Sequence, residues 1–167
     1  QALHLPALAA MADSADVFLD LNPFAAIKLS QVPCWRERPL LRIFLSPLSQ
    51  EEIGFLLEPD RHIDMQACVA EIMRRKLLWR THRQKNLLAL ADLEDIERRA
   101  ASAYAELQQA HRFDYVLVNH DGEGHDHWQA FGGPLGDARK VIGDFQRLWE
   151  GQSPLDAEHW PASLIPD

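Results

Sequence analysis

Three short and almost continuous apolar runs are the feature that most constrains how this 167-residue chain can fold. They lie at residues 16–21, 40–45 and 113–118, and longer polar or amphipathic stretches separate them. A strand that is apolar along its whole length is usually buried on both faces, as in a parallel sheet covered by helices. We therefore predict an α/β fold that has a parallel sheet core with helices on both faces.

The stretches around these runs carry helix signals. We expect helices at about residues 24–30, 49–57, 63–79, 90–110 and 137–149. The clearest is 90–110, whose apolar residues follow one another at spacings of three and four, as one face of a helix requires. Residues 31–39 are expected to form a loop. Residues 151–167 are expected to form an irregular strap anchored by Trp160 and Leu164.

Composition limits the class of protein. Hydrophobic residues make up 47% of the chain, which suits a single globular domain over 1–167. Seventeen Lys and Arg against twenty-five Asp and Glu give a formal charge of -8, which argues against nucleic acid or a membrane surface as partner. Cys34 and Cys68 lack CxxC spacing, so we expect a reducing compartment and a cytoplasmic protein. The chain does not begin with Met, and we expect it to start inside a longer product.

Basic residues are concentrated in one part of this acidic chain. Six of the seventeen lie within residues 74–85, and residues 72–91 contain no Asp or Glu. They are Arg74, Arg75, Lys76, Arg80, Arg83 and Lys85. Such a run is either a solvated helix face or a binding site for one anion, and the lack of interleaved acids favours the anion.

Polar residues follow the predicted strands at the edge where parallel sheets bind ligands. Asp20 ends the first run, where it would either hold magnesium or form a turn beside Asn22 and Pro23. Residues 120–127 carry six potential metal ligands: His120, Asp121, Glu123, His125, Asp126 and His127. Their spacing is loose for zinc, so they form either a polar loop or a metal centre.

Four blocks of sequence, over about residues 16–150, resemble the guanylate kinase family of P-loop nucleoside monophosphate kinases. VFLDLNPFAA at 17–26 resembles the family's apolar strand followed by D-I-D, and IFLSPLSQEEI at 43–53 is similar to its F-I-x-P-P-S-x-E-E-L. Arg80-Thr81, and then Ile96 to Glu106, resemble the lid R-G-T and I-x-x-R-L-x-x-A-x-x-E. FDYVLVNHD at 113–121 resembles Y-D-Y-V-I-V-N-D-D.

This resemblance implies a P-loop NTPase-like fold with a helical basic lid at about residues 61–91. It also implies transfer of a phosphoryl group from ATP, with Mg²⁺, to a nucleoside monophosphate such as GMP. Arg80 and Arg99 would be catalytic, Arg83 and Lys85 would bind phosphate, and Asn119 would contact the nucleotide base. Asp20 would lie beside the metal ion.

The chain also departs from the family pattern. The family's Gly-rich P-loop precedes the first block and is not in this sequence, so a missing N-terminal segment or another chain would have to supply it. Asn22 replaces the second acid of D-I-D, so within the kinase family a relative that acts on a ribose bisphosphate instead of GMP stays open. Two functions other than a kinase also stay open. One is a catalytically inactive protein-interaction module, and the other is a metal-dependent hydrolase that uses the 120–127 cluster.

Overall fold

The computed structural model describes residues 4–85, 87–122 and 124–166, and the chain forms two compact units, residues 1–41 and 42–167. The described residues of the first unit form three helices: α1 (Leu5–Ala12), α2 (Pro23–Gln31) and α3 (Pro33–Arg36). Asn22 caps α2 by accepting a 3.0 Å hydrogen bond from the amide of Phe24, and Pro23 occupies the first helical position. Residues 31–39, expected to be a loop, contain the short helix α3.

The strand predicted at 16–21 is wrong. These residues have no regular secondary structure and pair with no strand among the described residues. Val17 and Leu21 pack against a small cluster of Leu8, Leu29 and Trp35, whereas Phe18 is 59% exposed. A strand needs a partner for its backbone groups, and an apolar run does not show whether one is available.

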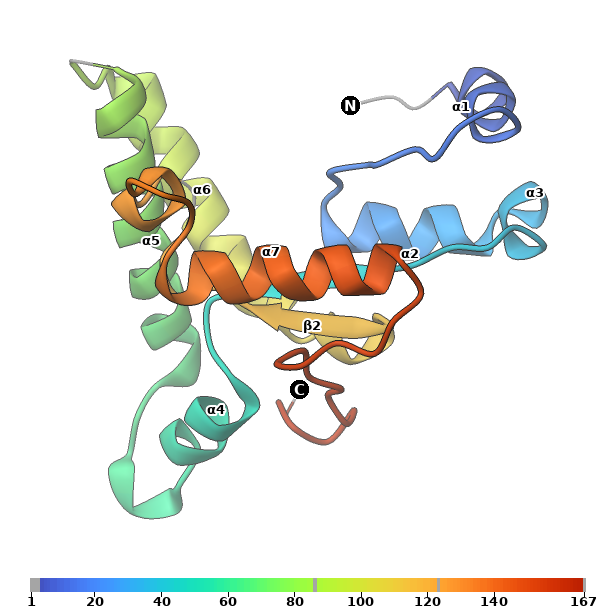
Figure 1. The fold of residues 1–167 in the computed structure, drawn as a ribbon. Helices are drawn as coiled ribbons and strands as arrows, with labels where there is room; N and C mark the ends of the chain where they lie inside the picture. Colours follow the sequence, from blue (N-terminus) through green and yellow to red (C-terminus); the bar gives the residue numbers. More distant parts are fainter. Residues whose placement is uncertain (1–3, 86, 123, 167) are drawn as a thin grey trace. The chain divides into compact units, whose positions relative to one another are not determined.

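The second unit carries the sheet and the longest helices in the described part of the chain (Figure 1). Its elements, in chain order, are β1 (Ile43–Ser46), α4 (Gln50–Leu56), η1 (Pro59–Arg61), α5 (Met65–Gln84), α6 (Leu90–Leu107), η2 (Ala110–Arg112), β2 (Tyr115–Val118), η3 (Asp126–Gln129) and α7 (Gly136–Trp149). The predicted helices are therefore confirmed, although α5 extends five residues further than expected. All of residues 74–84 consequently belong to this helix.

The two strands β1 and β2 are parallel and adjacent, with Phe44 opposite Val116 and Leu45 opposite Leu117. Before the strands begin, the Arg42 guanidinium donates to both oxygens of Asp114, at 2.6 and 3.2 Å. The α/β prediction thus holds in its coarse form, as a mostly helical unit around a small parallel sheet.

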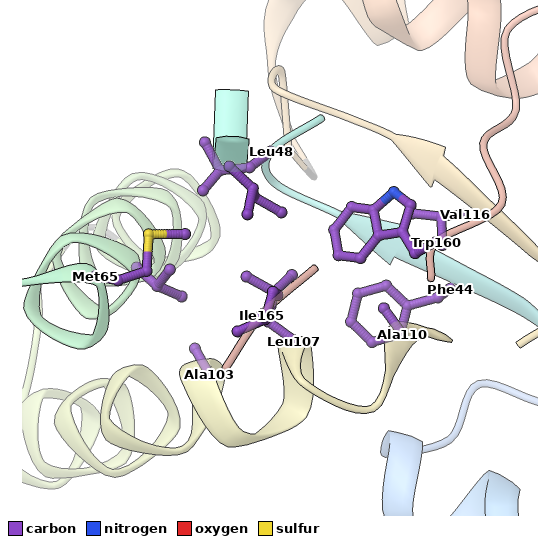
Figure 2. Packing of buried hydrophobic residues seen from close by; sticks show 11 residues of the cluster. Phe44, Leu48, Met65, Ala103, Leu107, Ala110, Val116, Trp160 and Ile165 are labelled. Carbon is purple, nitrogen blue, oxygen red and sulfur yellow. The ribbon is translucent and has the colours of Figure 1, made fainter. Parts of the chain in front are cut away.

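Side chains on one face of this sheet form the main core, which Figure 2 shows. Phe44 and Val116 lie there with Leu107 from the end of α6 and with Trp160 from the tail. The centroids of the Phe44 and Trp160 rings are 6.5 Å apart. The opposite side of β2 contacts α7.

The tail is irregular and contacts β2 and the start of α4. Glu158 forms an antiparallel bridge with Val116, with two hydrogen bonds of 2.8 Å, and the Glu158 carboxylate accepts from the amide of Gln50 and the indole of Trp160. Trp160 is buried, and Leu164 packs against the same core.

The long helices pack as a pair before the chain returns to β2. α5 and α6 lie side by side, and the end of α5 lies near the start of α6 (Figure 1). Asp64 caps α5 through a 2.9 Å hydrogen bond from the amide of Ala67. No helix in the described part of the chain is long and apolar enough to cross a membrane.

Candidate functional site

Several of the predicted site residues meet at the carboxyl ends of β1 and β2. They line a hollow of about 160 Å³, which we call the arginine hollow. Its walls are formed by Leu45, Ser46, Pro47, Met73, Lys76, Leu77, Arg80, Arg99, Asn119 and Gly122. The structure therefore brings together Arg80, Arg99 and Asn119, which the sequence places on three different elements.

The wall from α5 is one face of that helix. Met73, Lys76, Leu77 and Arg80 follow at intervals of three, one and three, so their side chains project to the same side. Arg80 is half-buried, whereas Arg99, from α6, is exposed. Two guanidinium groups that line one small hollow favour a ligand with several anionic oxygens, because each planar group can donate to two of them.

Lys76 adds a third cation to the arginine hollow. Its ammonium group donates a 2.6 Å hydrogen bond to the main-chain oxygen of Asn119, directly after β2. Burial lowers the pKa of Lys76 to about 8, and the negative charges of Asp121, Asp137 and Glu52 oppose part of that effect. An anion in the hollow would stabilise the charged form of this lysine.

Asn119 begins a turn at the end of β2. Its side-chain oxygen accepts a 3.2 Å hydrogen bond from the amide of Gly122, whose backbone lies at a φ of +66°. The conformation suits glycine, and the added carbon of an alanine would lie 3.4 Å from the Lys76 side chain. The turn therefore brings the backbone of residues 119–122 against the hollow.

The rest of the basic cluster is paired with acids that come before or after it in the sequence. Arg74 bonds Glu97 of α6 at 2.7 Å and Glu71 at 2.6 Å, and Arg75 bonds Glu71 at 2.8 Å. Of the predicted phosphate ligands, Arg83 pairs with Asp126 and Lys85 pairs with Asp92. Neither lines the arginine hollow.

Asp20, the predicted metal-binding carboxylate, lies in the first unit on the segment before α2, and it is exposed. The residues that line the arginine hollow all belong to the second unit. Among the described residues, the group of three ligand atoms close enough to share a metal ion does not include Asp20.

The residues of the 120–127 cluster separate into distinct groups in the fold. His120 bonds Asp137 at the start of α7 through Nδ1, and Glu52 of α4 through Nε2 at 2.7 Å. Burial lowers the pKa of His120, but the hydrogen bonds to these two carboxylates outweigh it, so that the net shift is upward. The histidine thus bridges the first turns of two helices.

The remaining histidines lie around Asp121. Nδ1 of His127 is 3.0 Å from Asp121 Oδ2, and Nδ1 of His125 is 3.7 Å from Asp121 Oδ1. One ligand atom from each of these three residues lies within 4.8 Å of the other two. Asp126 is instead engaged with Arg83, and Glu123 lies outside the described residues. We refer to Asp121, His125 and His127 as the His/Asp cluster.

The sequence places Lys76 only within the basic cluster and does not mark Glu52 or Asp137 as site residues. Lys76 carried a usable signal, because it is four residues from Arg80 and therefore on the same helix face. Glu52 and Asp137 resemble ordinary first-turn acids, which favour a helix N-terminus anywhere in a protein. Their shared contact with His120 depends on how α4 and α7 pack at the end of β2.

Comparisons with protein-family models, with curated proteins and with solved structures found no match, so the resemblance to guanylate kinases rests on the four sequence blocks alone.

Proposed function

We propose that the chain binds the phosphates of a nucleotide in the arginine hollow, as part of ATP-dependent phosphotransfer to a nucleoside monophosphate such as GMP. One observation carries the proposal: Arg80 and Arg99, which the family resemblance selects separately, line the same hollow. Lys76 and the turn at Asn119 complete its wall. Guanidinium groups held in place before the ligand arrives stabilise the charge on a transferring phosphoryl group.

The position of the hollow supports the same proposal. It lies beyond the carboxyl ends of two parallel strands, where ligands bind in sheets of this kind. Among the ten residues that line it, three are cationic and none is an Asp or Glu. The residues that line the hollow therefore attract a polyanion, because their charges are positive and none of them is a carboxylate.

The same lining does not fit a magnesium ion held by the protein, because Mg²⁺ prefers oxygen ligands and at least one carboxylate. Asp20 belongs to the other unit and is exposed. In this proposal, Mg²⁺ belongs to the ATP that carries it. The residues of this chain position phosphate oxygens and neutralise their charge.

Binding can be tested on the chain itself by following backbone amides and arginine side chains in NMR titrations with ATP and, separately, with GMP. We expect shifts at Arg80, Arg99 and Gly122 and weak binding, with a Kd in about the millimolar range, because no P-loop contributes. Micromolar or tighter binding of Mg·ATP would contradict the assumption that a P-loop is needed.

Arg99→Ala should weaken this binding about tenfold or more, since a hydrogen bond to a charged group contributes about 1.5–3 kcal/mol. Arg98→Ala is the matched control, because Arg98 is the next residue on the same helix and pairs with Asp95. With a P-loop supplied, Arg99→Ala should lower turnover by about 10²-fold. Equal effects of the two substitutions would refute the assignment of the site. A complete absence of nucleotide shifts would favour the protein-interaction module instead.

A further inference from the structure

We propose that the His/Asp cluster binds one divalent transition-metal ion, such as Zn²⁺, through Asp121, His125 and His127. The ion bound here is not the magnesium that accompanies ATP, and this metal site is independent of the proposed nucleotide site. Two imidazole nitrogens and one carboxylate oxygen form a donor set that suits zinc and its neighbours, whereas Mg²⁺ and Ca²⁺ require oxygen ligands throughout.

The distances in the cluster fit such an ion. Ligand atoms about 2.0–2.2 Å from a tetrahedral zinc ion lie roughly 3.4 Å apart. Asp121 Oδ2 is 3.0 Å from Nδ1 of His127, and the other oxygen, Oδ1, is 3.7 Å from Nδ1 of His125, so the two separations lie on either side of that value. One ligand atom from each of the three residues lies within 4.8 Å of the other two. Rotation of the rings, with loss of the 3.2 Å hydrogen bond that Nδ1 of His125 accepts from the His127 amide, would bring three such atoms to bonding distance.

The Asp121 carboxylate also accepts a hydrogen bond from a group outside the cluster. The amide of Ala138, in the first turn of α7, donates to Asp121 Oδ2 at 3.2 Å. This hydrogen bond orients the carboxylate, as groups around the ligands of metal centres usually do.

The backbone at the start of α7 closes against the cluster. Gly136 has a φ of +54°, and a side-chain carbon placed there would lie 2.9 Å from Nδ1 of His127 and 3.3 Å from Asp121 Oδ2. Only glycine fits this position without displacing the two ligands, since other residues rarely adopt this conformation and would also clash.

The loop that carries the histidines is tied to the rest of the unit by further hydrogen bonds. The Trp128 indole donates to the main-chain oxygen of Gly122 at 2.7 Å. The amide of Leu135 donates to the main-chain oxygen of His127 at 2.9 Å. Arg83 of α5 donates to the oxygen of Gly124 at 2.8 Å. These bonds restrict the loop before a metal ion arrives, which reduces the entropy lost on binding.

Three protein ligands leave at least one coordination position for water or for a ligand atom, as in zinc sites that carry out reactions. Gly122, which follows Asp121 directly, lines the arginine hollow. The metal site and the hollow therefore share one short turn of the chain.

The test uses the full chain, stripped of metal with a chelator and then titrated with Zn²⁺ against a chromophoric competitor, without nucleotide. We expect one Zn²⁺ per chain and no displacement by Mg²⁺. His125→Ala and His127→Ala should each weaken binding by about 100-fold or more, because losing even an outer partner of a metal ligand costs about 10–100-fold. His82→Ala, which removes an exposed histidine of α5, is the matched control and should leave the affinity unchanged.

A second measurement on the unchanged protein covers the case in which a variant does not fold. Imidazole nitrogen spectra should show Zn²⁺ shifting the ring signals of His125 and His127 but not those of His82. Equal losses of affinity in the His82→Ala control, or metal-induced shifts spread evenly over the histidines, would overturn the site. Nucleotide binding at the arginine hollow would be unaffected by that result.

Discussion

Replacing Lys76 with Met tests the electrostatics of the arginine hollow most directly. Burial lowers the pKa of this lysine to about 8 from its ordinary value of 10.5. The folded protein therefore releases the lysine proton at a lower pH than the unfolded chain does. Between these two values the unfolded chain binds more protons, so the contribution of Lys76 to stability rises with pH.

The size of the effect follows from the same two values. Each pKa unit corresponds to 1.36 kcal/mol, and a shift from 10.5 to about 8 gives roughly 3 kcal/mol over the whole titration. About 2.5 kcal/mol of this falls between about pH 7 and pH 10. Wild-type stability should therefore increase by about that amount relative to Lys76→Met over this range, because Met has no charge to bury.

Urea denaturation at several pH values, followed by circular dichroism, measures this difference. Lys140→Met is the matched control, since Lys140 is exposed on α7 and an exposed ammonium stays hydrated in both states. The reasoning is refuted if the wild-type and Lys76→Met curves stay parallel across the range. Added phosphate should stabilise the wild type more than Lys76→Met near neutral pH, since a bound anion favours the charged lysine.

Two further predictions concern contacts made by α7. Asp144 is 2% exposed and accepts hydrogen bonds from the amides of Leu155 and Asp156 at 2.6 and 2.8 Å. Asp144→Ala should therefore lower the free energy of unfolding, measured by urea denaturation, by about 3–5 kcal/mol. Glu150→Ala, at an exposed position, serves as control, and a loss under about 1 kcal/mol in Asp144→Ala would contradict this role. Because the pKa of His120 is raised in the folded protein, its contacts stabilise the protein below about pH 6.5, and this effect is lost as the pH rises through the folded-state pKa. The stability advantage of wild type over His120→Gln should therefore shrink on going from acidic to alkaline buffer. Because these groups are partly exposed, we expect about 1 kcal/mol or less, and an advantage that grew with pH would reverse the sign of the argument.

Local elements were predictable wherever the signal was itself local. Ser49 and Glu52 form the capping box of α4, with hydrogen bonds of 3.1 and 2.8 Å, within four residues of chain. The apolar stripe of α6 likewise depends only on spacing, and Ile96, Ala100 and Leu107 are buried as it requires. Such patterns need no knowledge of what the helix packs against.

The run at 16–21 shows where this reasoning fails. Its composition matches that of the runs that contain β1 and β2, yet Phe18 and Leu19 are exposed and no strand forms. Leu45, inside a real strand, is also 59% exposed. Apolar composition indicates that a segment gains from burial, but a strand exists only where a neighbour supplies its hydrogen bonds.

The candidate site was likewise predictable only in its local features. Sequence by itself determined that a cationic helix precedes an amphipathic one and that polar residues follow the strand at 113–118. Tertiary structure decided which cations meet: Arg74 and Arg83 are paired with carboxylates distant in the sequence, whereas Lys76 and Arg80 line the hollow with Arg99. Periodicity and capping act within a few residues of one another, whereas charge pairing depends on which side chains the packed helices bring within a few ångströms.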